Sequence, residues 1–377
     1  MWFRFFTKKA VFPENRLFLW LRNLVRFQRA DCPVRRIITF DPHLDNSTMQ
    51  SSSHLFPVAL ISAERRGDLI EDVYRLKPCN SPDPSVELAL TRLGLADPLA
   101  VRGVPVILVH GSFSNRRFWY SPKGIGLGPF LARAGYDVWI AEMRGHGLSA
   151  RNETYRHNRV ADYARYDLPA IAAFVREQSR QIPHWVGHSL GGTTLAAALG
   201  GHYLGSADAA SVALFGSQVS RTYWPLKIPP LQWSGRLLLK RFEHISGPRL
   251  KRGPEDEPMG LVLESMRWHG LFGRFGERDN HWWEGLRSVQ VPVLAVAAAG
   301  DHQDPEWACR MLFEQIGSPH KRFLCLGRQH GFAEDFGHVE MVVSKAAQRE
   351  VWPRVADWLR EQRKVTQGEP EREAVAG

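Results

Sequence analysis

The sequence predicts an α/β fold in which a mostly parallel sheet carries helices on both faces. Short apolar segments alternate along the chain with longer segments of helical spacing, as in strands joined by crossover helices. One apolar segment, residues 182–186, runs directly into glycines and a serine and then into the alanine-rich run 193–199. Residues 221–290 break the alternation, and we interpret them as a mostly helical cap inserted into the core.

Composition and charge narrow the class of protein. The chain has 377 residues, enough for one large α/β domain with an insertion. Its net charge of +10 suits an anionic membrane or a solvated basic surface. Nucleic acid is not expected as a partner, because no nucleic-acid motif is present and the arginines are spread along the chain. The cysteines are scattered without a C-x-x-C pair, which predicts no metal site, no disulfide framework and a reducing, cytoplasmic compartment: Cys32, Cys79, Cys309 and Cys325.

The first 53 residues are interpreted as a basic, aromatic leader and a linker. Within residues 1–36, the stretch 17–28 places apolar and basic side chains near helical spacing. A helix of this kind can lie on an anionic membrane, so peripheral membrane contact through the leader is one expectation. A helix packed on the domain or a frayed leader fits the same residues. The order of a secretory signal is not found, nor are the roughly 18 apolar residues of a membrane span.

Predicted elements follow the alternation along the chain. Residues 54–62 and 69–76 suit a hairpin around Arg66-Gly67-Asp68, whereas the proline-rich residues 77–103 suit a variable surface connection. Further strands are predicted at 104–110, 136–141, 182–186, 211–217, 291–298 and 320–326. Helices are predicted at 129–134, 160–178 and 347–359.

These elements divide the chain beyond the leader into a core, a cap and a tail. We expect the core to comprise residues 54–220 and 291–362, and the cap residues 221–290. Residues 363–377 are charged and are expected to be a disordered tail. Most aromatic residues of the cap are expected in its own core and the others in the wall of an apolar pocket: Trp224, Trp233, Phe242, Trp268, Phe272, Phe275, Trp282 and Trp283.

The segment 186–191 carries the most informative motif. A G-x-S-x-G core between a strand and a helix is typical of a nucleophile elbow, in which a strained turn exposes the serine hydroxyl above the sheet. Gly187 and Gly191 suit positions where the chain passes so close that a Cβ would clash. The helix from Leu190 would favour negative charge at its N-terminus. We therefore predict Ser189 as a nucleophile, the alternative being a glycine-rich turn with an incidental serine.

A serine hydroxyl is a weak nucleophile, so Ser189 needs a base, and the base needs an orienting acid. In this architecture the acid follows the serine and precedes the histidine along the chain. Asp301 lies in a small-residue turn after the predicted strand 291–298, where the chain leaves the sheet edge, and is the predicted acid. Asp304 is the alternative, although it also suits a helix N-cap ahead of Pro305.

Two histidines follow the last predicted strand. His330 comes soon after the strand, as many hydrolase bases do, and His338 precedes the terminal helix. His110 and His188 are expected to be structural, because each precedes a glycine turn that serves another purpose. The residues alone therefore leave both His330 and His338 as candidates for the base.

Two backbone N–H groups should face the negative charge that develops during the attack. One belongs to Leu190, directly after the nucleophile at the helix N-terminus. The other is expected from the loop after His110-Gly111, where Ser112 is the first choice and Phe113 the alternative. This chemistry requires no metal and no organic cofactor.

Residues 104–359 resemble the α/β-hydrolase superfamily of serine esterase and lipase type, and within it the gastric and lysosomal acid lipases. The resemblance is carried by Ala134-Gly135-Tyr136-Asp137-Val138-Trp139 with Arg144-Gly145 and Arg151-Asn152 after it, by Tyr166-Asp167-Leu168-Pro169-Ala170, and by Phe336-Gly337-His338-Val339-Glu340. It implies an α/β-hydrolase fold with a mostly parallel sheet, helices on both faces and a helical cap insertion. It also implies His338 rather than His330 as the base, and Asp301 as the acid.

The elbow departs from the family pattern G-H-S-Q-G, because Leu190 takes the place of the glutamine. The resemblance therefore transfers the catalytic machinery better than the triglyceride substrate. We predict a serine hydrolase that cleaves carboxylic esters through an acyl-enzyme, with a small-molecule ester or lipid as its substrate. An acyltransferase, a thioesterase or a C–C bond hydrolase would use the same Ser189, Asp301 and His338, and a non-catalytic scaffold of the same fold is the alternative from another class.

Overall fold

The computed structural model describes residues 58–97 and 99–367, with side chains described as far as Gln362. All of these residues belong to one compact unit, Asn46–Gly377. The predicted leader and linker, residues 1–53, lie outside the described residues, so membrane contact through the leader stays a prediction.

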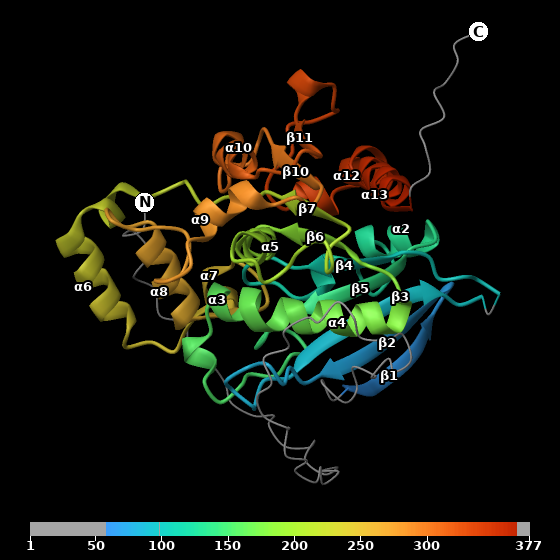
Figure 1. Cartoon of the computed structure of the whole chain (residues 1–377), viewed down its shortest axis with the longest axis horizontal. Helices are drawn as coiled ribbons and strands as arrows, with labels where there is room; N and C mark the ends of the chain where they lie inside the picture. The colour runs from blue at the N-terminus through green and yellow to red at the C-terminus, as the bar shows by residue number, and fades with distance from the viewer. Residues whose placement is uncertain (1–57, 98, 368–377) are drawn as a thin grey trace, which may run out of the picture. The chain divides into compact units, whose positions relative to one another are not determined.

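One sheet of nine strands forms the centre of the described chain, in the order β1-β2-β3-β5-β4-β6-β7-β10-β11 (Figure 1). The strands are β1 (Val58–Arg66), β2 (Leu69–Leu76), β3 (Leu88–Leu95), β4 (Pro105–Val109), β5 (Asp137–Glu142), β6 (His184–His188), β7 (Ser211–Phe215), β10 (Val293–Ala298) and β11 (Lys321–Leu326). The pairs among β1, β2, β3 and β5 are antiparallel, whereas every pair from β5 to β11 is parallel. The mostly parallel sheet confirms the predicted fold class.

The hairpin of β1 and β2 is confirmed, but the interpretation of residues 77–103 as a surface connection is wrong. They contain β3, which pairs with β2 from Leu69 opposite Leu95 and with β5 at Leu90 opposite Ala141. Most of the β3 side chains are buried. Prolines on both sides dominate the local sequence pattern, whereas the strand is stabilised by neighbours that lie far away in the chain.

Helices cover both faces of the sheet, as predicted (Figure 1). Helices α4 (Leu168–Ser179) and α5 (Leu190–Gly200) pack on one face, and α2 (Leu127–Arg133) and α13 (Trp352–Gln367) on the other. Alternate strand residues supply the two apolar clusters: Ile107, Trp139 and Trp185 to the first, and Val106, Val138 and Val186 to the second. The sheet is therefore buried on both sides, as expected for parallel strands.

The inserted segment contains helices and a small sheet. Its elements are η4 (Trp224–Lys227), α6 (Pro229–Leu239), β8 (His244–Ser246), α7 (Gly247–Leu250), β9 (Asp256–Pro258), α8 (Met259–Trp268), α9 (Trp282–Gly285) and η5 (Leu286–Ser288). The strands β8 and β9 pair antiparallel. We keep the name cap for residues 221–290.

The expectation that most cap aromatics form a core is wrong. Trp268, Phe275 and Trp282 are buried and stack edge to face on one another. Four others are largely exposed, with relative exposures of 71% for Trp224, 67% for Trp233, 53% for Phe242 and 88% for Phe272. Helix α6 buries none of its side chains. A 3.6-residue apolar pattern marks one face of a helix, but it does not reveal whether another part of the chain covers that face.

The remaining elements connect the core. They are η1 (Arg116–Phe118), η2 (Tyr155–His157), α3 (Val160–Asp162), the π-helical turn η3 (Tyr163–Asp167), α10 (Glu306–Gln315), η6 (Arg328–His330), α11 (Glu340–Val343) and α12 (Lys345–Glu350). The predicted helix 160–178 is thus interrupted by a π turn. Helix α13 continues to Gln367, past the start of the predicted tail at Arg363. Across the described residues, no helix is both long and apolar enough to cross a membrane.

Candidate active site

Ser189 lies at a strained turn between β6 and α5. Its backbone has φ 53° and ψ −118°, a conformation that a residue with a side chain rarely adopts. A Cβ on Gly187 would lie 2.6 Å from the backbone nitrogen of Gly192, and a Cβ on Gly191 would collide with the Val109 carbonyl. The two glycines therefore allow the tight strand-to-helix turn, and Ser189 occupies its tip with 8% relative exposure.

His338 and Asp301 form a short hydrogen bond near this turn. The Nδ1–H of His338 donates to Oδ2 of Asp301 at 2.7 Å. The other oxygen, Oδ1, accepts the backbone N–H groups of Gln303 and Asp304, each at 2.8 Å. Burial alone would lower the pKa of His338, but the hydrogen bond and charge of Asp301 outweigh it and raise the pKa above its usual value. The turn thus fixes a carboxylate that orients the imidazole and stabilises its protonated form.

Asp304 takes part in the same arrangement. The hydroxyl of Ser189 donates to Oδ2 of Asp304 at 3.4 Å, and the Gln218 amide donates to Oδ1 at 2.9 Å. His338 Nδ1 lies 3.8 Å from Oδ2 of Asp304. Burial raises the pKa of Asp304, although the nearby His338 partly opposes this. Within the described chain, no hydrogen bond joins Ser189 to His338; both instead approach one carboxylate oxygen.

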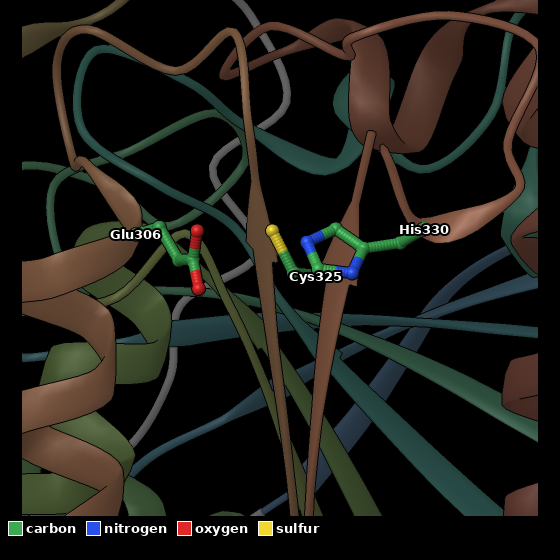
Figure 2. Close-up of side chains that lie close together, drawn as sticks. All are labelled: Glu306, Cys325 and His330. Atoms are coloured by element: carbon green, nitrogen blue, oxygen red, sulfur yellow. The ribbon is translucent and has the colours of Figure 1, made fainter. Parts of the chain in front are cut away.

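His330 lies elsewhere. It is exposed in η6, beside Cys325 and Glu306 (Figure 2). None of its described contacts is to Ser189 or Asp301. Of the two candidate bases, the structure therefore brings His338 and not His330 to the serine and the acid.

The loop after β4 passes directly against the serine. A Cβ on Gly111 would lie 3.0 Å from the Cβ of Ser189, a tight contact that glycine avoids. The next amide, that of Ser112, donates to no described group. By contrast, the Phe113 amide donates to Oε1 of Glu257 at 2.5 Å. The Phe113 amide, which was the alternative donor to the developing negative charge, is therefore already engaged. The amides of Ser112 and of Leu190, the first residue of α5, remain as candidate donors beside the serine.

His110 and His188 are buried, and hydrogen bonds engage both ring nitrogens of His110 and Nε2 of His188. The Met143 amide donates to Nε2 of His110 at 3.2 Å, and Nδ1 lies 2.9 Å from the Gly111 carbonyl. The Nε2–H of His188 donates to the His338 carbonyl at 2.8 Å. Burial lowers the pKa of each to about 3. Both are therefore neutral, and His188 holds the backbone of His338.

Sequence analysis missed a link between the cap and the loop after β4. Glu257, in β9, is 1% exposed, and its Oε2 lies 3.3 Å from Nε2 of the fully buried His146. Burial would lower the pKa of His146, but the charge of Glu257 outweighs it and raises the pKa. The same carboxylate accepts the Phe113 amide. No local pattern could have shown this, because the three residues lie on separate segments.

Another missed contact joins two of the stretches that resemble the acid lipases. Arg144, after β5, forms a buried ion pair with Asp167, and its Nε donates to Oδ2 at 2.9 Å. Both side chains are almost fully buried. Removing one partner of a buried ion pair destabilises the fold, because the other charge stays buried without compensation. It fixes the loop after β5 to the start of α4.

A hollow of about 410 Å³ lies between α6 and residues 270–281 of the cap. Its lining combines exposed apolar side chains with basic ones: Trp233, Leu271, Phe272, Arg236, Arg267, Arg274 and Arg278. The lining also includes one carboxylate, that of Glu277. The cap therefore presents an apolar surface beside a positively charged hollow.

Comparison with known proteins places the site in a family. The model of the Alpha/beta hydrolase family matches residues 106–341, more than half of the chain. Human gastric triacylglycerol lipase is 38% identical over 98 residues, 23% of this chain and 24% of that protein. Arabidopsis thaliana triacylglycerol lipase 1 is 36% identical over 113 residues, 28% of each chain. The matches thus span about a quarter of the length of these curated relatives.

The fold is also similar to that of solved structures. The monoacylglycerol lipase of Paleococcus ferrophilus superposes with a TM-score of 0.50 at 17% identity, covering 74% of this chain and 99% of that chain. At this identity the likeness concerns the fold alone.

Proposed function

The chain belongs to the alpha/beta hydrolase family, and from this premise we propose that it is a serine hydrolase of carboxylic esters with an apolar acyl or alcohol part. One observation carries the proposal: the strained Ser189 and the Asp301-bound His338 both approach Oδ2 of Asp304. The Ser112 and Leu190 amides lie beside the serine, where negative charge would develop. The lipase names of the curated relatives favour an ester substrate.

The reaction begins with a rotation of the Ser189 hydroxyl from Asp304 to Nε2 of His338. Hydrogen bonds of this kind are often long before substrate binds and tighten in the complex. The Ser189 oxygen attacks the ester carbonyl carbon while Nε2 of His338 accepts its proton. The carbonyl oxygen becomes an oxyanion that accepts the Ser112 and Leu190 N–H groups. Asp301 stabilises the imidazolium and keeps Nδ1 protonated.

Collapse of this intermediate breaks the bond to the alcohol. His338 returns its proton to the leaving oxygen, the alcohol departs, and the acyl group remains on Ser189. Water then loses a proton to His338 and attacks the acyl carbon. The second intermediate releases the acid and restores the serine. Every proton passes through His338.

A lipid surface is the proposed source of the substrate. The exposed cap side chains Trp233 and Phe272 and the neighbouring arginines suit an anionic membrane. The leader, residues 1–36, is proposed to contribute in the same way. The proposal therefore adds a second membrane contact, through the cap, to the contact that the sequence predicts for the leader.

A fluorophosphonate probe tests the proposal. Mass spectrometry of the labelled protein should find the adduct on Ser189, and Ser189→Ala should abolish both labelling and ester hydrolysis while leaving the circular dichroism spectrum unchanged. A panel of esters of increasing acyl length then defines the substrate, and a panel of acyl acceptors separates hydrolysis from acyl transfer. Labelling of another serine, with hydrolysis retained in Ser189→Ala, would refute the assignment.

A further inference from the structure

Glu306, Cys325 and His330 form a cluster outside the proposed triad. Glu306 is the first residue of α10, Cys325 lies near the end of β11, and His330 belongs to η6. One carboxylate oxygen, one sulfur and one imidazole nitrogen all lie within 4.8 Å of one another. Figure 2 shows the three side chains turned toward each other, with Cys325 in the middle. Three separate elements therefore bring three metal-ligating groups together.

We propose that this cluster binds a divalent transition-metal cation of the zinc class. A thiolate, an imidazole and a carboxylate are the ligand types that Zn²⁺ takes, and the sulfur disfavours Mg²⁺ and Ca²⁺. The donor atoms of one tetrahedral Zn²⁺ ion lie about 2.0–2.3 Å from it, so two donors are about 3.3–3.8 Å apart. Donor atoms at the 4.8 Å limit of the cluster must therefore approach one another by about 1 Å.

The chain permits this contraction. His330 is exposed on a surface turn and is followed by Gly331 at φ 82°, so its ring can move without disturbing the core. The Cys325 sulfur and a Glu306 carboxylate oxygen already lie within 4.8 Å of each other. Arg310 holds Oε1 of Glu306 at 2.5 Å, which orients the carboxylate from outside the cluster. As the cation binds, a metal–sulfur bond replaces the sulfur–hydrogen bond, and the thiol proton passes to water.

The position of the cluster indicates what a bound cation would do. Glu306 follows Asp301 and Asp304 on one turn, and His330 precedes His338 on the next connection. A bound cation would add a cross-link between these two segments, which are already joined by the bond between His338 and Asp301 and by the Gly300 N–H that donates to the Phe336 carbonyl. The cation would hold the proposed acid and base in register without touching substrate. The site stands on its own residues and does not depend on the proposed ester hydrolysis.

Cobalt titration tests the site. After dialysis against a chelator, the full-length protein should bind one Co²⁺ with the near-ultraviolet absorption of a thiolate–cobalt bond, and Zn²⁺ should displace it. His330→Ala, an exposed substitution that should fold normally, is expected to weaken Co²⁺ binding at least tenfold. Cys325→Ser should remove the absorption band. Zn²⁺ should raise the Tm of the wild-type protein more than that of either variant.

Two matched variants control for other cysteines and histidines. Cys309→Ser removes a second buried thiol, from α10, and His302→Ala removes an exposed histidine from the turn that follows β10. Both should retain the absorption band and the Tm shift. The proposal is overturned if the folded wild-type protein gives no thiolate–cobalt band, or if His330→Ala binds Co²⁺ as tightly as wild type.

Discussion

The sheet and the cap differ in how far their side chains are buried. In β4, β5, β6 and β7 every side chain is buried, and apolar clusters fill both faces of the sheet. In the cap, α6 buries nothing, and Trp233 and Phe272 are largely exposed. The cap is held to the core by a few buried apolar residues, such as Trp268 and Trp282, and by polar contacts of residues 255–257. Glu255 accepts from Asn115, Asp256 pairs with Arg151, and Glu257 accepts the Phe113 amide.

Because of this difference in burial, we expect the core and the cap to have two different roles. A sheet packed on both faces fixes the turns at its edge, so the core supplies and positions Ser189, His338 and Asp301. The cap reaches the site through Glu257, which contacts the loop that carries Ser112, and through Arg221, which donates to the carbonyls of His302 and Gln303 beside Asp301. Changes in the core should therefore affect bond breaking, and changes in the cap should affect the oxyanion donors and access to a lipid surface.

The largest effect is expected from the base. His338→Ala should lower kcat for a soluble ester by about 10⁴-fold or more, because only the oxyanion donors and substrate binding remain. His330→Ala should change kcat by less than about tenfold, since that side chain lies in the other cluster. Steady-state kinetics of both variants measure the two changes in kcat. A greater loss in His330→Ala would reverse the assignment of the base.

The two aspartates provide the next comparison. Asp301→Asn should lower kcat by about 10⁴-fold, because the amide no longer orients the imidazole as a carboxylate does. Asp304→Asn should retain most of the activity, since an amide oxygen can still accept from Ser189. The raised pKa of His338 places the acidic limb of the pH–rate profile above about 6.5, and removing the Asp304 charge should move it to lower pH. A larger loss in Asp304→Asn than in Asp301→Asn would make Asp304 the acid, whereas an unchanged limb would contradict an effect of the Asp304 charge on His338.

A smaller effect is expected at the contact between cap and core. Glu257→Ala leaves the Phe113 amide without its acceptor and should lower the free energy of unfolding by about 1–3 kcal/mol. It should also reduce kcat/KM about tenfold, because the Ser112 loop loses its support. Urea denaturation measures the first quantity. Glu255→Ala, at a neighbouring half-buried carboxylate, is the control and should cost less.

The contribution of the ion pair between His146 and Glu257 to the stability of the fold should decrease as the pH rises. The pKa of His146 is raised in the folded protein, so its pairing with Glu257 stabilises the fold below about pH 6.5 and is lost as the pH rises through the raised value. Glu257→Gln, which keeps an acceptor for Phe113, should therefore differ most from wild type in acid. Denaturation curves that differ more at alkaline pH would contradict the ion pair.

The smallest effect concerns the cap surface. Trp233→Ser combined with Phe272→Ser should weaken sedimentation with anionic vesicles about tenfold, because two apolar side chains no longer enter the interface. Turnover of a soluble short ester should stay within about twofold. Leu99→Ser with Val101→Ser, two equally exposed apolar residues outside the cap, is the control. Equal loss in both pairs would mean that the cap is not the contact. Deletion of residues 1–36 measures the share of the leader.

Local signals predicted most of the core. The hairpin of β1 and β2, the parallel strands and the turn at Ser189 follow from apolar runs, glycines and spacing, which act between neighbouring residues. Strand β3 was missed because its partners lie elsewhere in the chain. The burial of the cap aromatics was misjudged for a related reason, since a sequence does not show which face another segment covers.

By itself, the sequence determined the fold class and singled out Ser189, Asp301 and His338 as candidates. Only the tertiary structure decided which residues meet. It placed His338 against Asp301, turned Ser189 toward Asp304, directed Glu257 of the cap to the Phe113 amide, and gathered Glu306 and Cys325 around His330. The physical reason is that these contacts join residues from separate elements. Their approach depends on how strands and helices pack, and no local pattern records that packing.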